Sequence, residues 1–372
     1  MQILKPVCVG VLMLSIIANN KLSAKNNPIK ADVRAKAFKR AAGLDNGISI
    51  SWLEQTWSKD ILTDNQPTEA DFRLLKKLGF RSIRIPVAFG YIEEQHIPIE
   101  KVLNLIDGVL RQCHTYGFKL VIDYHSGKLD DGNYNTEASR VIDSWSIVVR
   151  HYLHESTDNL FYELYNEPPH MDPQRWKDAA YNMVTALRKI DADRTFIVGA
   201  SNYNSIYELS RFVRLADDNI IYTFHFYEPF LFTHQGAEWV GDQAATTGIP
   251  FPYNGDNFPQ LNLRAKNTAG ENNYNKYHLD GNEQSVMDKL TIIKQWGDKY
   301  QVPIFCGEYG VYNKYADADS RCRYIKAVRV ALKKLNIPGM LWDYNTNFSI
   351  FSGKPAWDTL PVCMKEALGI SP

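Results

Sequence analysis

The sequence contains few cysteines, and their positions do not indicate a metal site. Five of the 372 residues are Cys, and Cys8 lies in an apolar N-terminal run. The other four, Cys113, Cys306, Cys322 and Cys363, are too few for a disulfide framework in a chain of this length. Cys306 falls in an apolar run and is expected to be a buried thiol, whereas Cys322 and Cys363 could pair, a point that the sequence leaves open. No CxxC motif and no pair of histidines suggests a bound metal.

The chain also lacks net charge. Lys and Arg total 42, Asp and Glu total 42, and the formal net charge is zero. This balance gives no electrostatic reason to expect a nucleic acid or an anionic membrane as a partner. The hydrophobic fraction of 45% and the charged fraction of 23% are those of a globular protein with a sizeable core.

The first residues have the pattern of a secretory signal. A basic residue precedes an apolar segment from Val7 to Ile17, and a polar stretch then ends in Leu22-Ser23-Ala24. An apolar core this short, followed by a small residue, predicts a cleaved signal peptide over residues 1–24 and a secreted or periplasmic protein. An N-terminal anchor left in place is the alternative. Residues 25–40 are expected to form a polar tail, and residues 41–370 one folded domain with no linker or second domain.

Within that domain, short apolar runs alternate with amphipathic stretches. Eight runs are predicted to be strands: Gly47–Ser51, Ser82–Val87, Lys119–Tyr124, Leu160–Tyr165, Thr195–Ala200, Ile220–His225, Pro303–Glu308 and Gly339–Tyr344. Most lack polar alternation, as strands covered on both faces do. Between them lie helical patterns, one of which begins at Asp172-Pro173, a capping residue followed by proline. Eight such units predict an α/β fold, a single-domain (β/α)8 TIM barrel. An open doubly wound sheet is the alternative, but no glycine-rich phosphate loop follows the first strand.

Polar residues recur where the predicted strands end. In a (β/α)8 barrel these ends form one rim, at which the chemistry takes place. Six of the eight strands deliver such residues: Arg84, His125, Asn166 and Glu167, His225 with Tyr227, Glu308, and Trp342. Placing so many polar groups around one opening is costly unless they bind one another or a ligand.

Two of these residues are glutamates that would face each other across the barrel. Glu167 and Glu308 are predicted to end the fourth and seventh strands. Glycoside hydrolysis needs such a pair, one carboxyl group to protonate the leaving oxygen and one carboxylate to act at the anomeric carbon. A separation of roughly 5–5.5 Å gives retention of configuration, and about 6.5–9.5 Å gives inversion. The alternative is structural, with each glutamate bound to an Arg or His.

The ordered set of motifs resembles glycoside hydrolase family 5, the large cellulase and mannanase family. The shared signals, in order, are IRIPV with Arg84, DYH with His125, NEP with Asn166 and Glu167, His225 with Tyr227, GEYG with Glu308, and Trp342. They cover nearly the whole chain after residue 40. The segment FTHQGAEW, residues 232–239, is similar to bacterial endoglucanases of that family. Relatives often carry a second His or an Asn after the position of His125, where this chain has Ser126-Gly127.

The resemblance implies roles for these residues. Glu167 would be the acid/base and Glu308 the nucleophile, held ionised by Arg84 and Tyr227. Asn166 would bind the sugar 2-hydroxyl. His125 and His225 would orient carboxylates and sugar hydroxyls, and Trp342 would stack under the sugar.

The long segment after the sixth predicted strand, from Tyr227 to about Asn282, carries further candidates. His234 and Trp239 are candidate sugar contacts. Phe251, Tyr253 and Phe258 could line a groove but are expected rather to anchor the segment.

The activity implied is that of a retaining endo-β-1,4-glucanase acting on soluble β-glucan. A mannanase or glucomannanase is the close alternative, and xyloglucan and mixed-linkage glucan stay open. A transglycosylase would use the same intermediate. A non-hydrolytic glycan-binding protein is the alternative of another class, but it would have no need for both glutamates. No cofactor or metal is expected, the partner is a β-1,4-linked polysaccharide or oligosaccharide, and a monomer is expected although the sequence does not determine the oligomeric state.

Overall fold

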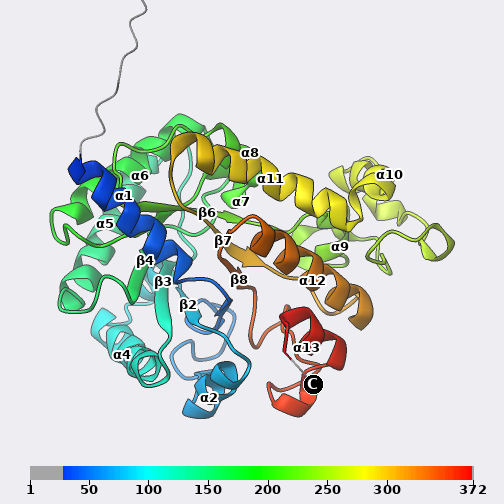
Figure 1. The fold of residues 1–372 in the computed structure, drawn as a ribbon, viewed down its shortest axis with the longest axis horizontal. Helices are drawn as coiled ribbons and strands as arrows, with labels where there is room; N and C mark the ends of the chain where they lie inside the picture. The colour runs from blue at the N-terminus through cyan, green and yellow to red at the C-terminus, as the bar shows by residue number, and fades with distance from the viewer. Residues whose placement is uncertain (1–27, 371–372) are drawn as a thin grey trace, which may run out of the picture.

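Eight parallel strands close into a barrel in which each strand pairs with the next and the last pairs with the first (Figure 1). The computed structural model describes residues 28–370, so the predicted signal peptide, residues 1–24, lies outside the described residues. The strands are β1 (Gly47–Ser49), β2 (Ser82–Val87), β3 (Lys119–Tyr124), β4 (Leu160–Glu163), β5 (Phe196–Val198), β6 (Ile220–His225), β7 (Ile304–Tyr309) and β8 (Gly339–Leu341). Each overlaps one predicted strand. The barrel prediction is confirmed, and the open-sheet alternative is wrong.

The strands are buried on both faces, which explains their unbroken apolar sequences. All six residues of β2, β6 and β7 are buried. One layer inside the barrel, near the N-terminal ends of the strands, consists of Val121, Phe161, Ile197, Ile221, Phe305 and Met340. This apolar layer leaves the polar rim at the opposite ends of the strands.

Helices surround the barrel. Their bounds are α1 (Pro28–Ala42), α2 (Glu69–Lys77), α3 (Phe89–Glu94), α4 (Ile99–Tyr116), α5 (Tyr134–His151), α6 (Pro173–Arg188), α7 (Ser201–Asn204), α8 (Ile206–Arg211), α9 (Phe230–Thr233), α10 (Ala269–Asp280), α11 (Glu283–Tyr300), α12 (Ala318–Lys334) and α13 (Val362–Leu368). The predicted cap of α6 is confirmed, because the Asp172 carboxylate accepts the backbone N–H groups of Gln174 and Arg175 at 2.8 and 3.1 Å.

The prediction of a polar tail over residues 25–40 is wrong for residues 28–40, which belong to helix α1. This helix, blue in Figure 1, covers the end of the barrel where the strands begin. Ala41 and the adjacent Leu44 are buried against the apolar layer inside the barrel. Arg40 is buried as well and binds Asp158 and Asp193. The face of α1 toward the barrel contains mainly alanine and one arginine, so the sequence carries no strong amphipathic pattern there.

The connection from β6 to β7 folds into a lobe at the right of Figure 1. It contains α9, α10 and the 3-10 turns η1 (Glu238–Val240), η2 (Asp242–Ala244), η3 (Gly255–Asn257) and η4 (Leu263–Ala265). Phe258 stacks on Tyr274 and Tyr277 of α10, and Tyr253 packs edge-on against Phe258. Phe251 is buried against Phe232. The expectation that Phe251, Tyr253 and Phe258 anchor this segment is confirmed.

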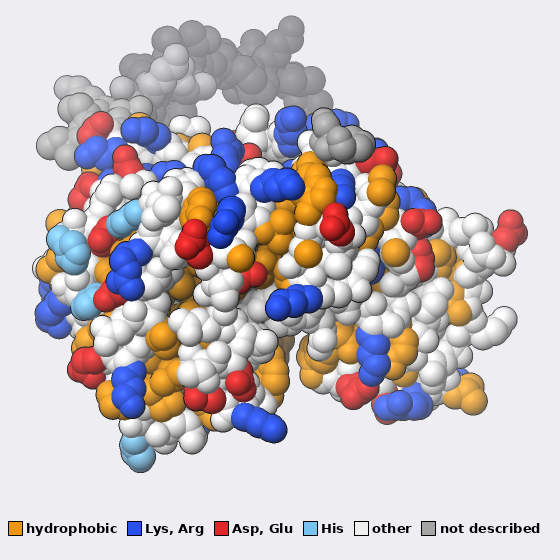
Figure 2. Space-filling view, turned by 90° about the horizontal axis from the view of Figure 1, so that it is seen from below, with side chains coloured by type: hydrophobic (Ala, Val, Ile, Leu, Met, Phe, Trp, Pro, Cys, Tyr) orange, Lys and Arg blue, Asp and Glu red, His pale blue; other side chains and the backbone are white. Residues whose placement is uncertain are grey.

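Cys322 of α12 and Cys363 of α13 form a disulfide, which resolves the pairing that the sequence left open. Cys113 and Cys306 are buried free thiols, as expected for Cys306. In the part of the chain described, no helix has the length and apolar character needed to cross a membrane. Over the face shown in Figure 2, basic and acidic side chains are interspersed.

Candidate active site

The polar residues predicted at the strand ends converge on one hollow of about 550 Å³. Its lining contains seven of the ten predicted site residues: His125, Glu167, Tyr227, His234, Trp239, Glu308 and Trp342. Arg84, Asn166 and His225 are not part of this lining but bond to residues that are: Arg84 to Glu308, Asn166 to His125 and His225 to Glu167. The sequence interpretation therefore identified residues that the fold brings together.

The two glutamates meet although 141 positions separate them in the sequence. Glu308 lies in β7 and is buried, whereas Glu167 follows β4 and is partly exposed. One carboxylate oxygen of each and a ring nitrogen of His225 all lie within 4.8 Å of one another. Carboxylate oxygens this close fit retaining glycosidases, whose carboxyl groups lie about 5–5.5 Å apart, and not inverting ones, at roughly 6.5–9.5 Å.

Glu167 has an unusual backbone conformation. Strand β4 ends at Glu163 and not at Tyr165 as predicted, so Glu167 lies four residues beyond the strand. Its φ is +43°, in the left-handed region that non-glycine residues seldom adopt. Such strain persists where surrounding contacts impose it and is typical of functional sites. Pro168 and Pro169 follow, and their carbonyl oxygens accept hydrogen bonds from the backbone of residues 202 and 203.

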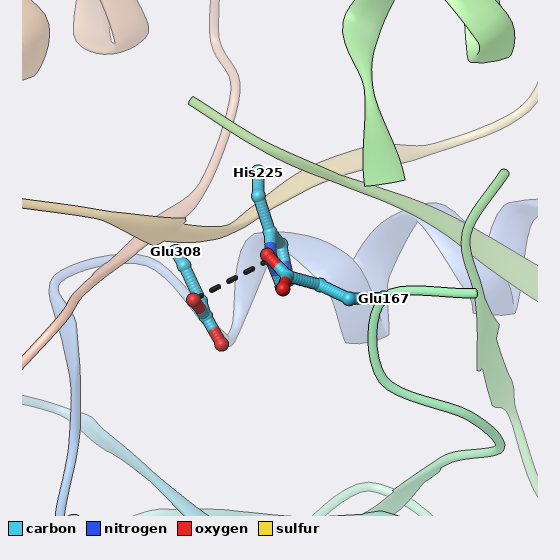
Figure 3. Close-up of side chains that lie close together, drawn as sticks. All are labelled: Glu167, His225 and Glu308. Carbon is cyan, nitrogen blue, oxygen red and sulfur yellow. Dashed lines mark hydrogen bonds and ion pairs between the residues drawn. The ribbon is translucent and has the colours of Figure 1, made fainter. Parts of the chain in front are cut away.

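His225 lies between the two glutamates (Figure 3). Its Nδ1 is 2.7 Å from Glu167 Oε1 and 3.4 Å from Glu308 Oε2. Burial alone would lower the pKa of His225, but the charge of Glu308, the Glu163 carboxylate at 3.9 Å and the hydrogen bond to Glu167 outweigh it and raise the pKa to about 10. His225 therefore carries a positive charge between two carboxylates at neutral pH.

The register of β6 and β7 brings His225 beside Glu308. The two strands pair with a bulge at this point, which places His225 opposite Glu308. Gly307 permits the approach, since a Cβ there would lie 2.5 Å from Thr223 Oγ1 and 3.2 Å from His225 Nε2. Close packing therefore explains why the first residue of the GEYG motif, Gly307, is a glycine.

Arg84 is fully buried and connects the carboxylates. Its guanidinium donates to Glu308 at 2.8 Å and to Asn166 Oδ1 at 2.8 Å. It also binds Glu163 at 2.7 Å and Asp123 at 3.1 Å. Burial opposes ionisation of Glu163, but the positive charges of Arg84 and His225 prevail and lower its pKa to about 2.

Asp123 and Glu163 were not predicted as site residues. Asp123 also accepts from His125 Nδ1 at 2.8 Å, and the pKa of His125 is raised because this carboxylate outweighs the effect of burial. Both acids belong to strands already identified, in DYH and ELYNE. A charged residue inside an apolar strand next to the rim was the signal that could have revealed them.

Tyr227 and Trp342 complete the lining around Glu308. The Tyr227 hydroxyl donates to Glu308 Oε2 at 2.8 Å. The Trp342 ring lies parallel to the His125 ring, with centroids 5.7 Å apart. Tyr227 and Arg84 therefore bind different oxygens of the same carboxylate, and both contacts stabilise its ionised form.

His234 and Trp239 differ in their exposure. His234 is buried and stacks on Phe230 at 4.2 Å, and burial lowers its pKa to about 4. Trp239 is exposed and packs edge-on against Tyr312. Trp239 therefore presents an exposed aromatic ring to the hollow, whereas His234 contributes a largely buried ring that is uncharged at neutral pH.

Glu54 and Trp57, which follow β1, also line the hollow and were not predicted from the sequence. Glu54 is buried and bonded to the Ser51 hydroxyl. Burial raises its pKa to about 8, with further contributions from Asp343 and Glu308 and an opposing one from His125. No motif surrounds Glu54, and only its position just beyond a strand could have indicated it.

A second hollow of about 600 Å³ adjoins the first at Glu167. It shares Glu167, Tyr227, His234 and Trp239 with the first hollow but does not include Glu308. Glu167 therefore lies where the two hollows meet.

By donor type, Glu167, His225 and Glu308 could also ligate a cation. However, His225 Nδ1 is engaged with Glu167, and its raised pKa means that the ring would first have to lose a proton. This arrangement suits a hydrogen-bonded carboxylate pair better than a metal centre.

Comparison with known proteins agrees with the site. The profile of the family cellulase (glycosyl hydrolase family 5) matches residues 40–348. Endoglucanase 3 of Fibrobacter succinogenes is 30% identical over 336 residues, which cover 82% of this chain but only 50% of that protein. This chain thus spans about half the length of that relative. Endoglucanase C of Acetivibrio thermocellus is 31% identical over 328 residues, covering 84% of this chain and 93% of its own.

Solved structures share the fold. Those of Thermotoga maritima Cel5A with cellobiose and with mannotriose each have a TM-score of 0.71 at 24% identity, covering 89% of this chain and 99% of theirs. The family match includes both Glu167 and Glu308 and the eight barrel strands. This chain belongs to glycosyl hydrolase family 5, the cellulase family.

Proposed function

We propose that the protein is a retaining endo-β-1,4-glucanase that cleaves internal bonds of soluble β-glucans. The observation that carries the proposal is the placement of Glu167 and Glu308, with oxygens within 4.8 Å, beside a hollow with aromatic walls. The two hollows that adjoin at Glu167 support internal cleavage, because an internal bond needs room for sugars on either side.

In the first step Glu308 attacks the anomeric carbon, and Glu167 gives its proton to the leaving oxygen. Arg84 and Tyr227 hold the two oxygens of Glu308 and keep them aimed into the hollow. In the second step Glu167 takes a proton from water, the water oxygen bonds to the anomeric carbon, and the bond to Glu308 breaks. The sugar leaves with its original configuration.

We expect the Glu167 carboxyl group to become protonated when substrate binds. In the free protein burial raises the pKa of Glu167, but the hydrogen bond and charge of His225 outweigh burial and lower it. Glu167 is partly exposed, so a bound sugar would remove water from it, and desolvation favours the neutral carboxyl. We therefore expect Glu167 to gain its proton as the glycan binds, with His225 Nδ1 as the nearest donor at 2.7 Å.

The surrounding residues fit a sugar at the cleavage point. Trp342 offers a ring beneath it, and Trp239 an exposed ring across the hollow. Asn166 is oriented by Arg84 at 2.8 Å and directs its amide toward His125 Nε2 at 3.5 Å. We propose that this amide meets the sugar 2-hydroxyl.

The test uses Glu308→Gln and Glu167→Gln on carboxymethylcellulose, with Glu69→Gln on exposed α2 as the control. Each site variant should lose several orders of magnitude in kcat and keep the wild-type melting temperature, whereas the control should keep full activity. Proton NMR of the first products should detect the β anomer before mutarotation. Near-normal turnover by either site variant would contradict the assignment, and an initial α anomer would contradict retention.

A mannanase or glucomannanase is the second candidate. The favouring observation is that Thermotoga maritima Cel5A, similar in fold, has been solved with both cellobiose and mannotriose. Hydrolysis rates would decide between glucanase and mannanase activity, measured on carboxymethylcellulose, mixed-linkage glucan, glucomannan and galactomannan. Faster cleavage of galactomannan would overturn the glucanase preference.

We also propose a secreted or periplasmic location. The Cys322–Cys363 disulfide supports it, since such bonds persist in oxidising compartments. A monomeric state and the absence of a nucleic-acid partner stay predictions. The glycan-binding alternative is disfavoured by the paired carboxylates, and release of new reducing ends would exclude it.

A further inference from the structure

The two ring nitrogens of His225 face different partners. Nδ1 lies 2.7 Å from Glu167 Oε1, and Nε2 lies 3.2 Å from the side-chain amide nitrogen of Asn204. Glu163 Oε1 is 3.9 Å from Nε2, which is too far for a hydrogen bond. Among the residues that the structure describes, the Asn204 amide is therefore the hydrogen-bonding partner of Nε2, although no sequence motif pointed to this asparagine.

The backbone of Asn204 is held by the loop that carries the acid. Residues 202, 203 and 204 have φ values of +58°, +61° and +53°, and three consecutive non-glycine residues in the left-handed region are rare. The N–H groups of residues 202 and 203 donate to the carbonyls of Pro169 and Pro168, at 3.0 and 2.8 Å. These prolines directly follow Glu167. The position of Asn204 is thus tied to that of Glu167.

The Asn204 amide is buried and only half satisfied. Within the described part of the chain, Oδ1 has no hydrogen-bond partner, which is costly for a residue with no exposed surface. The amide packs beside Gly199, where an added Cβ would lie 1.9 Å from Oδ1 and 3.0 Å from Nδ2. The two ends of an amide have nearly the same shape. The space that Gly199 leaves therefore accepts the amide in either of two orientations.

Each orientation of the amide suits a different state of the His225 ring. A neutral ring with its proton on Nδ1 has a bare Nε2, which accepts from the Asn204 NH2 group and leaves Oδ1 unpaired. A ring with a proton on Nε2 needs an acceptor there, and the amide turned over presents Oδ1 to it. The second orientation satisfies the buried oxygen as well.

Only a ring with a proton on Nε2 can supply the acid. When both nitrogens are protonated, Nδ1 can pass its proton to Glu167, and the ring stays neutral with its remaining proton on Nε2. When Nε2 is bare, the proton on Nδ1 is the last one, and a neutral imidazole does not give it up near neutral pH. The His225–Glu167 pair is therefore loaded for catalysis when it holds two protons and is not loaded when it holds one.

We propose that Asn204 is a positioning residue for the reaction, because its amide oxygen accepts from Nε2–H of His225 and so keeps the His225–Glu167 pair loaded with the proton for the leaving oxygen. This inference rests on the proposed function, in which Glu167 is the acid. In the second step Glu167 takes a proton from water and returns it to Nδ1. The pair then ends the cycle as it began, and Nε2 keeps its proton throughout.

The charged groups around His225 also favour the loaded pair. Glu167 follows β4, Glu163 belongs to β4, and Glu308 of β7 lies 3.4 Å from Nδ1. Together these carboxylates raise the pKa of His225 to about 10 against the effect of burial. Arg84 of β2 binds Glu163 and Glu308 and offsets part of their charge.

The strand on the other side of β6 does not add to this balance. It is β5, Phe196–Val198, which has no titratable side chain. The partner on Nε2 is therefore neutral, and its contribution is a hydrogen bond. A change of the side chain at position 204 should alter that hydrogen bond without changing any of the three carboxylates.

The test replaces Asn204 by Gly and by Asp, both of which tolerate a left-handed backbone. Asn204→Gly removes the acceptor, so the alkaline limit of kcat/KM on cellotetraose should move down by about one pH unit, the effect of a lost hydrogen bond to a charged group. Asn204→Asp supplies acceptor oxygens with a charge and should move this limit up. Asn336→Gly, an exposed left-handed asparagine beyond α12, is the control and should keep the wild-type profile.

A second measurement needs no substrate. Nitrogen-15 NMR of protein labelled at its histidine nitrogens shows which ring nitrogens carry protons, and the His225 signals are those missing from His225→Gln. In Asn204→Gly, His225 should lose its second proton about one pH unit below the wild type, and in Asn204→Asp above it.

Opposite shifts by the two variants would support the inference, because damage to the fold would not raise the limit for either. Shifts in the same direction, no shift, or a loss of activity by the same factor at every pH would mean that Asn204 acts only through packing, and any of these overturns it. If the NMR shifts occur but the wild type cleaves no glucan, the proposed function is wrong, whereas the contact between Asn204 and the Nε2–H of His225 stands.

Discussion

Glu54 is buried beside the proposed nucleophile, where a negative charge on it is unfavourable. In an unfolded chain it loses its proton near pH 4.5, but in the folded protein burial raises the pKa to about 8. Between these values the folded state binds more protons than the unfolded state. The free energy of unfolding therefore decreases as the pH rises from about 4.5 to 8.

We predict that Glu54→Gln abolishes this decrease in the free energy of unfolding, because the amide does not ionise. Its free energy of unfolding should exceed that of the wild type by an amount that grows through this pH range to on the order of 4 kcal/mol at pH 8. Below pH 4 the two proteins should be nearly equal. Urea unfolding at pH 4, 6 and 8 measures this, with exposed Glu69→Gln as the control. If the difference in free energy of unfolding between Glu54→Gln and the wild type does not grow with pH, the prediction is wrong.

The site could be predicted from sequence to the extent that its residues stand at strand ends. Glu167 and Glu308 follow recognisable apolar runs, and a closed barrel brings such ends together. Glu163 and Asp123 were not predicted as site residues, because in sequence a charged residue only interrupts an apolar run. Their role becomes visible when the fold places Arg84 between them. The left-handed backbone of Glu167 was equally hidden, because tertiary contacts impose it.

At the scale of elements, α1 covers the end of the barrel opposite the site. Ala41 and Leu44 close over the apolar layer of the strands. Arg40 fixes the helix: it binds Asp158 at 2.8 Å, the Asp193 carboxylate at 2.6 Å and the Thr195 hydroxyl at 3.0 Å. These contacts join the helix to the loops before β4 and β5.

We predict that Arg40→Ala lowers the free energy of unfolding by about 3 kcal/mol, because it removes several charge-assisted hydrogen bonds from a side chain that is 4% exposed. Lys39→Ala is the matched control, since Lys39 is 81% exposed and lies 3.9 Å from Asp158. Its cost should stay within about 0.5 kcal/mol. Urea unfolding measures both variants, and equal costs would refute the assigned role of Arg40. Hydrolysis by folded Arg40→Ala should be normal.

Strands were easier to predict than the elements around them. A barrel strand is covered on both faces, so its apolar run is unbroken and can be recognised without knowing its partners. Helix α1 buries alanines and an arginine, which resemble a solvent-exposed helix or tail in sequence. The turn at residues 202–204 has no local signal in the sequence, because its three left-handed residues are held by hydrogen bonds to Pro168, Pro169 and His225.

For the whole molecule, the absence of net charge suits a neutral glycan. On the face shown in Figure 2, acidic and basic side chains are interspersed. Affinity must then come from aromatic surfaces and hydrogen bonds in the hollows, so we expect binding to depend little on salt.

The Cys322–Cys363 disulfide joins α12 to α13 and closes a loop across 41 residues that contains β8. Trp342 follows β8, so the bridge restrains the segment that carries one wall of the site. Constraining the unfolded chain over this length is worth up to about 4 kcal/mol.

We predict that reduction, or Cys363→Ser, lowers the melting temperature by several degrees, and that reductant has no further effect on Cys363→Ser. Cys113→Ala in the presence of reductant controls for effects on the buried free thiol, since it should respond to reductant as the wild type does. If reduced and oxidised wild type melt together, the bridge does not restrain the unfolded chain, and the barrel contacts of β8 alone must hold Trp342 in place.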